Sequence, residues 1–296
     1  MTALPTLRQL EYLLLLVEQG SFHQAADVAG VTQPALSSGL RELERLLGAP
    51  VLERRRGDIL LTPTGEEAVQ RAAEILAKVE DLVEAAHIGN RALFGRFRLG
   101  IIPTVAPFLL SDGFVELKTR YPALDIRVCE DHAPALLKSL AAGKLDGVVI
   151  ALPYHAPGID HQSIGRDEIM VAAPVGHPLA GEGPLPKGML KAEDLMLLED
   201  GDCFRAQALA LAGLEAPRNE GCVAKTLHTL IQMTASGMGV CFVPAMAIRA
   251  GLVEGLAVRV RPIASPAPAR DIILGWRPGS SRAGDARLIA EALKLG

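Results

Sequence analysis

The sequence predicts a chain of two parts: an all-helical N-terminal region with a long linker helix, and a C-terminal region of two α/β lobes. Residues 1–62 show apolar residues at helical spacing, with glycines where the helices should end. Residues 63–94 carry small and apolar residues at a period of about 3.5, which is typical of a coiled coil. Residues 95–296 alternate short apolar strands with helices, and this alternation indicates an α/β fold.

The first helix is predicted to end at Gly20 and to bury one apolar stripe. The stripe residues recur at i, i+3, i+4 and i+7 and are Leu10, Leu13, Leu14 and Val17. Ser21 and Gln24 form a capping-box pattern that opens a second helix, and Gly30 closes that helix. Thr32 is expected to cap a third helix. Two short helices joined by a tight turn at Gly30 indicate a helix-turn-helix.

The outer face of the third helix carries short polar side chains and one arginine, which suit base edges and phosphates in a major groove. Two short strands, 51–52 and 59–61, then form a wing with arginines at its tip. The net charge is -4, so attraction to DNA must come from this local patch, and an ordinary solvated helical domain is the alternative. The residues predicted to bind DNA are Thr32, Gln33, Pro34, Ser37, Ser38, Arg41, Arg54, Arg55 and Arg56.

The helix that begins near Pro63 is expected to pair with a second copy of the chain. Its small and apolar residues are separated by alternating steps of four and three, which is the seam of a coiled coil. The alternative is a helix that lies on its own domain. Strict heptads favour a helical partner, so we expect dimerisation through Ala68, Ala72, Ile75, Val79, Leu82 and Ala86.

The C-terminal region is expected to fold as two similar lobes: lobe I from residues 95–165 and 266–296, and lobe II from residues 166–265. Alternating strands and crossover helices predict parallel sheets. Ligands of such folds bind at the carboxyl ends of strands and in the cleft between lobes. The expected strands are 97–102, 125–130, 146–152, 168–174, 195–200, 220–224, 239–244, 257–263 and 270–278.

Several classes of protein are not expected from this sequence. Four cysteines show no Cys-x-x-Cys spacing and no nearby histidine that completes a zinc pattern, so we expect reduced thiols in the cytoplasm, and no metal or other cofactor. Glu18 breaks the N-terminal apolar run, which indicates an amphipathic helix rather than a signal peptide, and no apolar stretch is long enough to span a bilayer. The motifs of hydrolases, P-loop proteins and zinc proteases are missing, so an enzyme is not expected.

Residues 7–68 carry a resemblance to a known family. The run LRQLEYLLLLVEQGSFHQAADVAGVTQPALSSGLRELERLLGAPVLERRRGDILLTPTGEEA resembles the winged helix-turn-helix of LysR-type transcriptional regulators almost position by position. The resemblance covers the whole chain, because members have a linker helix and a two-lobed domain like that of periplasmic binding proteins. It implies binding to double-stranded operator DNA, a homodimer or homotetramer, and contact with RNA polymerase.

Cys203 stands at the start of a predicted helix, where the helix N-terminus favours a thiolate. Arg205 would add positive charge, whereas three acids oppose it: Glu199, Asp200 and Asp202. The residues alone favour a buried, inert cysteine. The same packing role is expected for Cys129 and Cys241, which lie inside apolar strands.

A closer resemblance changes the interpretation of Cys203. The segments IIPTVAPFLL (101–110), GKLDGVVIAL (143–152), LMLLEDGDCFRAQA (195–208) and RDIILGWRPGS (270–280) are similar to the OxyR branch, the hydrogen-peroxide sensors of the LysR type. The resemblance implies that Cys203 reacts with peroxide to give a sulfenic acid, that Thr104 helps to hold the peroxide, and that Arg270 lies near the reactive site.

The chain departs from this branch at three places. Ala212 stands where the branch has its second, resolving cysteine, and Asp202 replaces the histidine before the reactive cysteine. Residues 130–133 replace the segment where a threonine is usual. Oxidised Cys203 would therefore stay sulfenic, pair with Cys222, or form a mixed disulfide, and we favour the first.

Two other functions remain open at this point. One is a LysR-type regulator that binds a small metabolite or anion between the lobes, with Cys203 incidental. The other is a thiol peroxidase, which would need a route back to the thiol, and the sequence offers no resolving cysteine at the family position for such a route.

Overall fold

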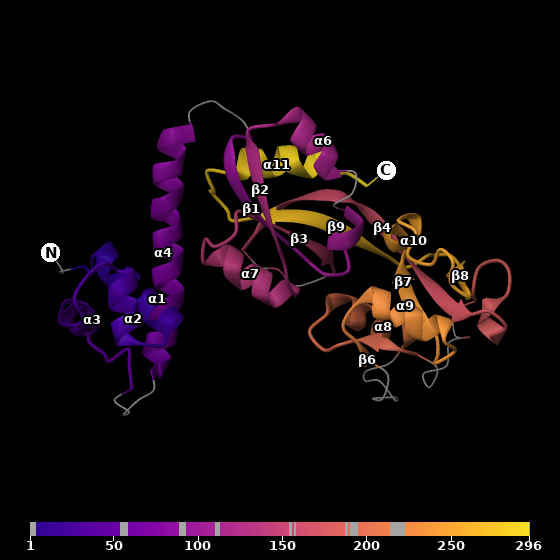
Figure 1. Cartoon of the computed structure of the whole chain (residues 1–296), viewed down its shortest axis with the longest axis horizontal. Helices are drawn as coiled ribbons and strands as arrows, with labels where there is room; N and C mark the ends of the chain where they lie inside the picture. The colour runs from indigo at the N-terminus through magenta and orange to yellow at the C-terminus, as the bar shows by residue number, and fades with distance from the viewer. Residues whose placement is uncertain are drawn as a thin grey trace. The chain divides into compact units, whose positions relative to one another are not determined.

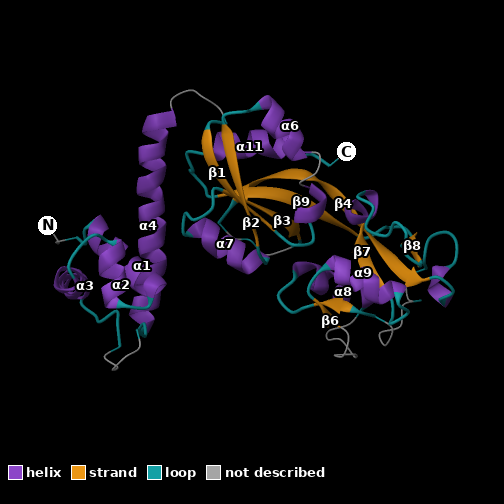
Figure 2. Cartoon of the chain, in the orientation of Figure 1, coloured by secondary structure: helices purple, strands orange, loops and turns teal. Residues whose placement is uncertain are grey.

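The computed structural model describes residues 4–53, 59–88, 93–109, 113–153, 156, 158–186, 189, 195–213 and 223–295. The chain divides into two compact units, residues 1–89 with 141–144 and residues 90–140 with 145–296. Figure 1 follows the chain through both units, and Figure 2 shows that the first is helical and the second mixes helices with strands.

The first unit opens with three helices: α1 (Leu7–Gln19), α2 (Phe22–Val28) and α3 (Gln33–Leu47). Gly20 and Gly30 have φ of 63° and 65°, a conformation that favours glycine and ends the preceding helix. Leu36, Leu40 and Leu43 of α3 are buried against α1 and α2. The predicted helix-turn-helix is confirmed.

The caps differ from the prediction. The capping box lies at Thr6 and Gln9, where Thr6 Oγ1 accepts a hydrogen bond from Gln9 N at 3.3 Å and Gln9 Oε1 accepts one from Thr6 N at 2.8 Å. Ser21 and Thr32 occupy the N-cap positions of α2 and α3, but neither side chain makes a cap hydrogen bond. The backbone turn therefore starts these two helices without the expected side-chain bond.

The buried face of α1 also differs from the predicted stripe. Val17 is 38% exposed, because α1 packs against α2, α3 and α4 at once and turns a different face inward. The buried residues of α1 are Leu10, Tyr12, Leu13 and Leu16.

Helix α4 (Pro63–Ile88) completes the first unit, and the residues of its predicted seam fall into two groups. Ala72 is buried and Ala68 packs beside it on the core of the three-helix domain, so the first part of α4 lies on its own domain. Ile75 and Leu82 are 43% and 71% exposed, so the later part leaves large apolar side chains uncovered in the single chain. Val79 is half-buried, and the side chain of Ala86 lies outside the described residues.

Lobe I is built on a mixed sheet with the order β2 (Leu124–Glu130), β1 (Gly95–Ile101), β3 (Gly147–Leu152), β9 (Ala269–Trp276) and β4 (Asp160–Pro174). Strand β1 is parallel to β2 and β3, and β9 is antiparallel to β3 and β4. In Figure 1, α6 and α11 lie on one side of this sheet and α7 on the other. The helices of lobe I are α5 (Ala106–Leu109), α6 (Gly113–Arg120), α7 (Ala133–Ala141) and α11 (Ala283–Ala292).

Lobe II is built on the second half of β4, which pairs antiparallel with β7 (Cys241–Pro244) and β8 (Val258–Pro262). A separate parallel pair joins β5 (Leu197–Leu198) to β6 (Val223–Ala224). The helices of this lobe are α8 (Cys203–Ala212), α9 (Leu227–Ala235) and α10 (Ala245–Arg249), with a 3₁₀ turn at Pro178–Ala180.

The prediction of parallel sheets is wrong for most of this unit. Strand β4 begins at Asp160 rather than at 168, because its first half pairs with β9 in lobe I before its second half enters lobe II. Strand β4 pairs antiparallel with its neighbours in both lobes, and the alternation of strands and helices along the sequence does not show this. Among the described residues, no helix is long and apolar enough to cross a membrane.

Candidate functional site

The centre of the α/β unit is a buried ion pair where β4 passes from lobe I to lobe II. Asp167 of β4 is the register partner of Arg270 of β9, and Arg270 Nε lies 3.0 Å from Asp167 Oδ2. Neither side chain has exposed surface. Asp167 Oδ1 accepts a second hydrogen bond from Met246 N at 2.8 Å, which ties the N-terminal end of α10 to the same carboxylate.

Arg270 also holds Thr104, which follows β1. Arg270 Nη1 donates to Thr104 Oγ1 at 2.9 Å, and Arg270 Nη2 donates to the Thr104 carbonyl at 3.0 Å. Thr104 is 1% exposed. The structure therefore brings together two of the residues predicted from the sequence, and it adds Asp167, which sequence reasoning missed because the strand register that pairs it with Arg270 was not visible.

Cys203 is the first residue of α8 and is 7% exposed. It comes from lobe II, yet it belongs to the apolar core cluster formed mainly by lobe I residues. The ring of Phe204, the next residue, lies 5.1 Å from the guanidinium carbon of Arg270. The start of α8 thus lies against the Arg270 site, with Cys203 at the contact between the lobes.

Two opposing effects set the acidity of the Cys203 thiol. Burial, followed by the negative charge of Asp202, raises its pKa from 9.0 to about 11, although the positive charge of Arg270 acts to lower it. Asp202 is itself buried, and burial raises the pKa of its carboxyl against the hydrogen bond from Phe204 N and the charge of His132. The thiol is consequently protonated at neutral pH.

Asp202 links the start of α8 to lobe I. Its Oδ1 accepts a hydrogen bond from Phe204 N at 2.7 Å, as expected of an N-cap carboxylate. Its Oδ2 lies 3.9 Å from Nδ1 of His132, which follows β2 in lobe I. His132 Nε2 lies 3.5 Å from Glu199 Oε1, so one imidazole faces two lobe II carboxylates. Sequence analysis did not single out His132, because its partners are far along the chain.

The other predicted residues of this region lie apart from the thiol or outside the described residues. Arg205 is used locally, with Nε 2.8 Å from Asp200 Oδ1 and Nη1 donating to the Leu198 carbonyl at 2.6 Å. Cys222 lies outside the described residues. Gln207 stands one turn after Cys203, and both polar atoms of its side chain are buried without a partner among the described residues. The sequence shows the spacing of Gln207 from Cys203, but not that its amide is buried.

The remaining cysteines give one correction. Cys241 is buried as expected, and Thr234 Oγ1 lies 3.2 Å from its sulfur. Cys129 is exposed, contrary to the prediction, because β2 is the edge strand of its sheet and most of its residues face solvent.

The helix-turn-helix presents the predicted recognition residues at the start of α3. Thr32, Gln33, Pro34, Ser38 and Arg41 are exposed, and Ser37 is half-buried. Arg54, Arg55 and Arg56 lie outside the described residues.

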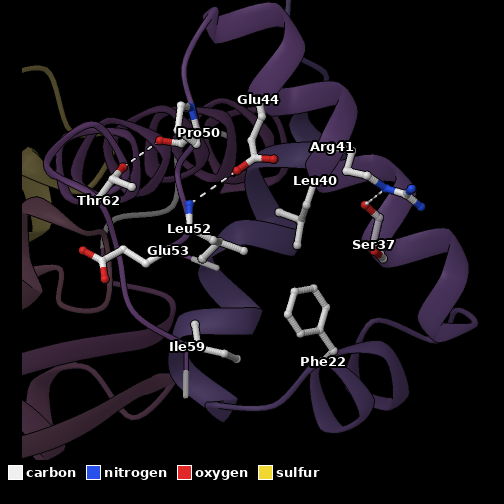
Figure 3. Close-up of a pocket in the computed structure, with 10 residues that line it drawn as sticks. All are labelled: Phe22, Ser37, Leu40, Arg41, Glu44, Pro50, Leu52, Glu53, Ile59 and Thr62. Carbon is white, nitrogen blue, oxygen red and sulfur yellow. Dashed lines mark hydrogen bonds between the residues drawn. The ribbon is translucent and has the colours of Figure 1, made fainter. Parts of the chain in front are cut away.

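A pocket of about 970 Å³ lies between α3 and the two sides of the wing (Figure 3). Along its edge, Arg41 Nε donates to the Ser37 carbonyl at 3.3 Å. Glu44 Oε1 accepts hydrogen bonds from the backbone N–H groups of Val51 at 2.9 Å and Leu52 at 3.4 Å. Glu44 therefore fixes the first side of the wing to the recognition helix, a role that the sequence did not reveal.

Comparison with known proteins covers both units. The model of the bacterial regulatory helix-turn-helix of the lysR family matches residues 7–66, and that of the LysR substrate binding domain matches residues 90–295. A probable hydrogen peroxide-inducible genes activator of Streptomyces viridosporus is 36% identical, over 98% of this chain and 94% of that protein. The transcriptional regulator EstR of Acinetobacter baylyi is 34% identical, over 99% of this chain and 98% of that protein.

A solved structure agrees with these sequence matches. A full-length variant of OxyR from Pseudomonas aeruginosa superposes with a TM-score of 0.78 at 28% identity, over 99% of this chain and 98% of that one. This likeness confirms the expected fold class, a helical DNA-binding domain followed by a two-lobed α/β domain. The chain therefore belongs to the LysR family of DNA-binding transcriptional regulators and is related to its OxyR-type, peroxide-inducible activators.

Proposed function

We propose that this regulator senses hydrogen peroxide by oxidation of Cys203 and then alters the transcription of oxidative-stress genes. The observation that carries the proposal is the position of Cys203, a buried thiol at the contact between the lobes, beside the Arg270 and Thr104 site. The name of the Streptomyces viridosporus relative, a peroxide-inducible activator, supports the same signal.

The chemistry needs one thiol and one peroxide molecule. The Cys203 thiol loses its proton, the thiolate sulfur attacks one oxygen of the peroxide, and the O–O bond breaks. The leaving hydroxide takes up one proton and becomes water, while the sulfur becomes a sulfenic acid. Thr104 and Arg270 supply hydrogen-bond donors and positive charge near the developing anion, and Asp202 disfavours the thiolate.

Oxidation of Cys203 would affect the rest of the domain by changing how the side chains around the sulfur pack. The sulfur of Cys203 lies in an apolar cluster shared with lobe I, and a sulfenic acid adds a polar oxygen there that needs hydrogen-bond partners. The unpartnered amide of Gln207, one helical turn away, is a suitable partner for this oxygen. A change in the contact between the lobes then follows without a second cysteine, since Ala212 ends α8 where the branch has its resolving thiol.

The regulator would act on DNA as a homodimer or homotetramer. Thr32, Gln33, Pro34, Ser37, Ser38 and Arg41 at the start of α3, with Arg54, Arg55 and Arg56 in the wing, would contact the operator. Ile75, Val79 and Leu82 would form the apolar seam between two copies of α4, because Ala68 and Ala72 already pack on the core of their own domain. A contact with RNA polymerase would complete the response.

Intact mass spectrometry tests the sensor assignment. After one equivalent of peroxide, the chain should gain one oxygen; a loss of two hydrogens would indicate pairing with Cys222, and addition of a small thiol would indicate a mixed disulfide. The variant Cys203→Ser should show none of these changes. A Cys203→Ser protein that still changes operator binding in response to peroxide would exclude the proposal.

A second candidate is a regulator that responds to a metabolite or anion held between the lobes. The high pKa of about 11 for Cys203 favours it, because the thiolate is the form of a cysteine that attacks peroxide. Such a protein would show a ligand-dependent shift of its melting temperature and no dependence on peroxide.

A further inference from the structure

The histidine that faces the start of α8 comes from the opposite lobe. His132 follows β2 in lobe I, while the two carboxylates that it faces, on Glu199 and Asp202, precede and cap α8 in lobe II. The Asp202 side chain is 3% exposed and is held beside Cys203 by its other oxygen, which caps the helix at Phe204. The chain thus holds a buried carboxylate beside its buried thiol, with one imidazole from the opposite lobe facing the carboxylate.

We propose that His132 is the positioning residue that offsets the Asp202 carboxylate and so keeps Cys203 able to form a thiolate. The inference rests on the proposed function for its purpose, but it concerns the reactivity of the thiol itself. A negative charge next to a thiol opposes loss of its proton, and a positive charge close to that carboxylate cancels part of the effect. His132 acts through Asp202, since its imidazole faces the carboxylates.

His132 is partly exposed and lies among acidic groups. Its side chain is 29% exposed, so it exchanges protons with solvent, and histidine is the side chain whose charge changes near neutral pH. The charged groups near it include acids from both lobes. From lobe I they are Glu130 and Asp131, from lobe II Glu199, Asp200 and Asp202, with Arg205 bound to Asp200 and Arg270 bound to Asp167.

One consequence is that closure of the lobes controls the thiol. The thiol and its carboxylate belong to lobe II, and the compensating charge belongs to lobe I. Any movement that separates the lobes removes His132 from Asp202 and leaves the carboxylate free to oppose thiolate formation. The reactive form of Cys203 is therefore the form in which the lobes are in contact.

A double-mutant cycle tests the inference on the full chain. The rate of alkylation of Cys203 by iodoacetamide is followed by peptide mass spectrometry, which separates Cys203 from the other cysteines, in the wild type and in His132→Gln, Asp202→Asn and the double variant. We expect His132→Gln to slow the reaction about tenfold when Asp202 is present, which corresponds to one pKa unit, and less than about twofold in the Asp202→Asn background. His161→Gln, at an exposed histidine of β4, is the matched control.

The pH profile gives a readout that a purely structural role would not change. Below its pKa, a thiol reacts about ten times faster for each unit of pH. A histidine loses its positive charge as the pH rises through neutrality, which would oppose this rise, so the wild-type slope should be shallower than that of His132→Gln. Equal slowing by His132→Gln in both backgrounds, or parallel pH profiles, would overturn the inference. His132→Asn serves as the second variant if His132→Gln has a lowered melting temperature.

This test separates the inference from the proposed function. Alkylation requires a thiolate but no peroxide, so the cycle reports on His132 even if peroxide is not the signal. A wild-type chain that gains no oxygen from peroxide, combined with a positive cycle, would reject the sensor and keep the role of His132. A wild-type chain that gains one oxygen from peroxide, combined with equal slowing by His132→Gln in both backgrounds, would keep the sensor and reject the role of His132.

Discussion

Asp167 and Arg270 face each other in the register of β4 and β9, and their side chains form an ion pair with no exposed surface. Arg270 adds two hydrogen bonds to Thr104, and Asp167 adds one to the backbone of Met246. The ion pair thus connects four segments from both lobes: β4, β9, the residues that follow β1, and α10. It lies where the two lobes join.

Breaking this pair should destabilise the α/β domain strongly. Arg270→Met leaves Asp167 buried without its cation, and the free energy of unfolding should fall by about 3–5 kcal/mol in urea denaturation. The double variant Arg270→Met with Asp167→Leu should recover part of this loss, since no uncompensated charge remains. A loss below about 1 kcal/mol for the single variant would show that water reaches the site.

The raised pKa of Cys203 predicts a loss of stability at high pH. The folded thiol titrates at about 11 and the unfolded one at 9.0, so the unfolded state releases the proton first. The contribution to stability is full below pH 9 and is lost as the pH rises toward 11, by at most about 2–3 kcal/mol. Cys203→Ala should reduce this loss in denaturation curves at pH 8 to 10.5, whereas Cys129→Ala, at an exposed thiol, should not.

Removing the carboxylate beside the thiol should raise reactivity. Asparagine caps a helix as well as aspartate does, so Asp202→Asn should keep the fold of α8. Its thiol should react faster at pH 7, by up to about tenfold, with both iodoacetamide and peroxide. An unchanged or slower rate would mean that the Asp202 charge does not act on Cys203.

The recognition helix predicts a specific loss of DNA affinity. Arg41→Ala should weaken operator binding by ~1–3 kcal/mol if the guanidinium is bidentate to a base, as measured by fluorescence anisotropy. Arg45→Ala is the control from the same helix, because Arg45 is paired with Glu42. Affinity should fall with salt, and an affinity independent of salt would contradict phosphate contacts.

The exposed apolar residues of α4 predict the oligomeric state. Ile75→Glu or Leu82→Glu should convert the assembly to smaller species in sedimentation velocity at micromolar concentration. Glu80→Lys, at an exposed position of the same helix, should leave it unchanged. A wild-type chain that is already monomeric at this concentration would contradict the proposed seam.

The fold and the individual residues were predictable from the sequence to different degrees. The helix-turn-helix followed from local signals, since glycines such as Gly20 and Gly30 end helices by their own backbone conformation. Cys203, Thr104 and Arg270 were identified through resemblance, because nothing local links residues so far apart in the chain. Arg205 was expected beside the thiol from its position in the sequence, but its guanidinium contacts Asp200.

The parts that sequence reasoning missed depend on long-range register. Asp167 pairs with Arg270 only because β4 continues from lobe I into lobe II, and His132 meets Asp202 only because the lobes close on each other. The seam of α4 stays a prediction, and a period alone does not distinguish Ala72, which its own domain covers, from Leu82, which is uncovered in the single chain.

Strand β4 passes without interruption from the sheet of lobe I to that of lobe II, and a β-bulge between Ser163 and Gly165 lies in its lobe I half. A continuous hydrogen-bonded strand resists bending but yields to twist, and bulges increase the local twist. Because the lobes share this twisted strand, we expect them to move by a rotation about β4 rather than by the opening of a loop hinge. A signal at Cys203 would be carried as a small rotation of one lobe, with an elastic return to the resting state once the sulfur is reduced.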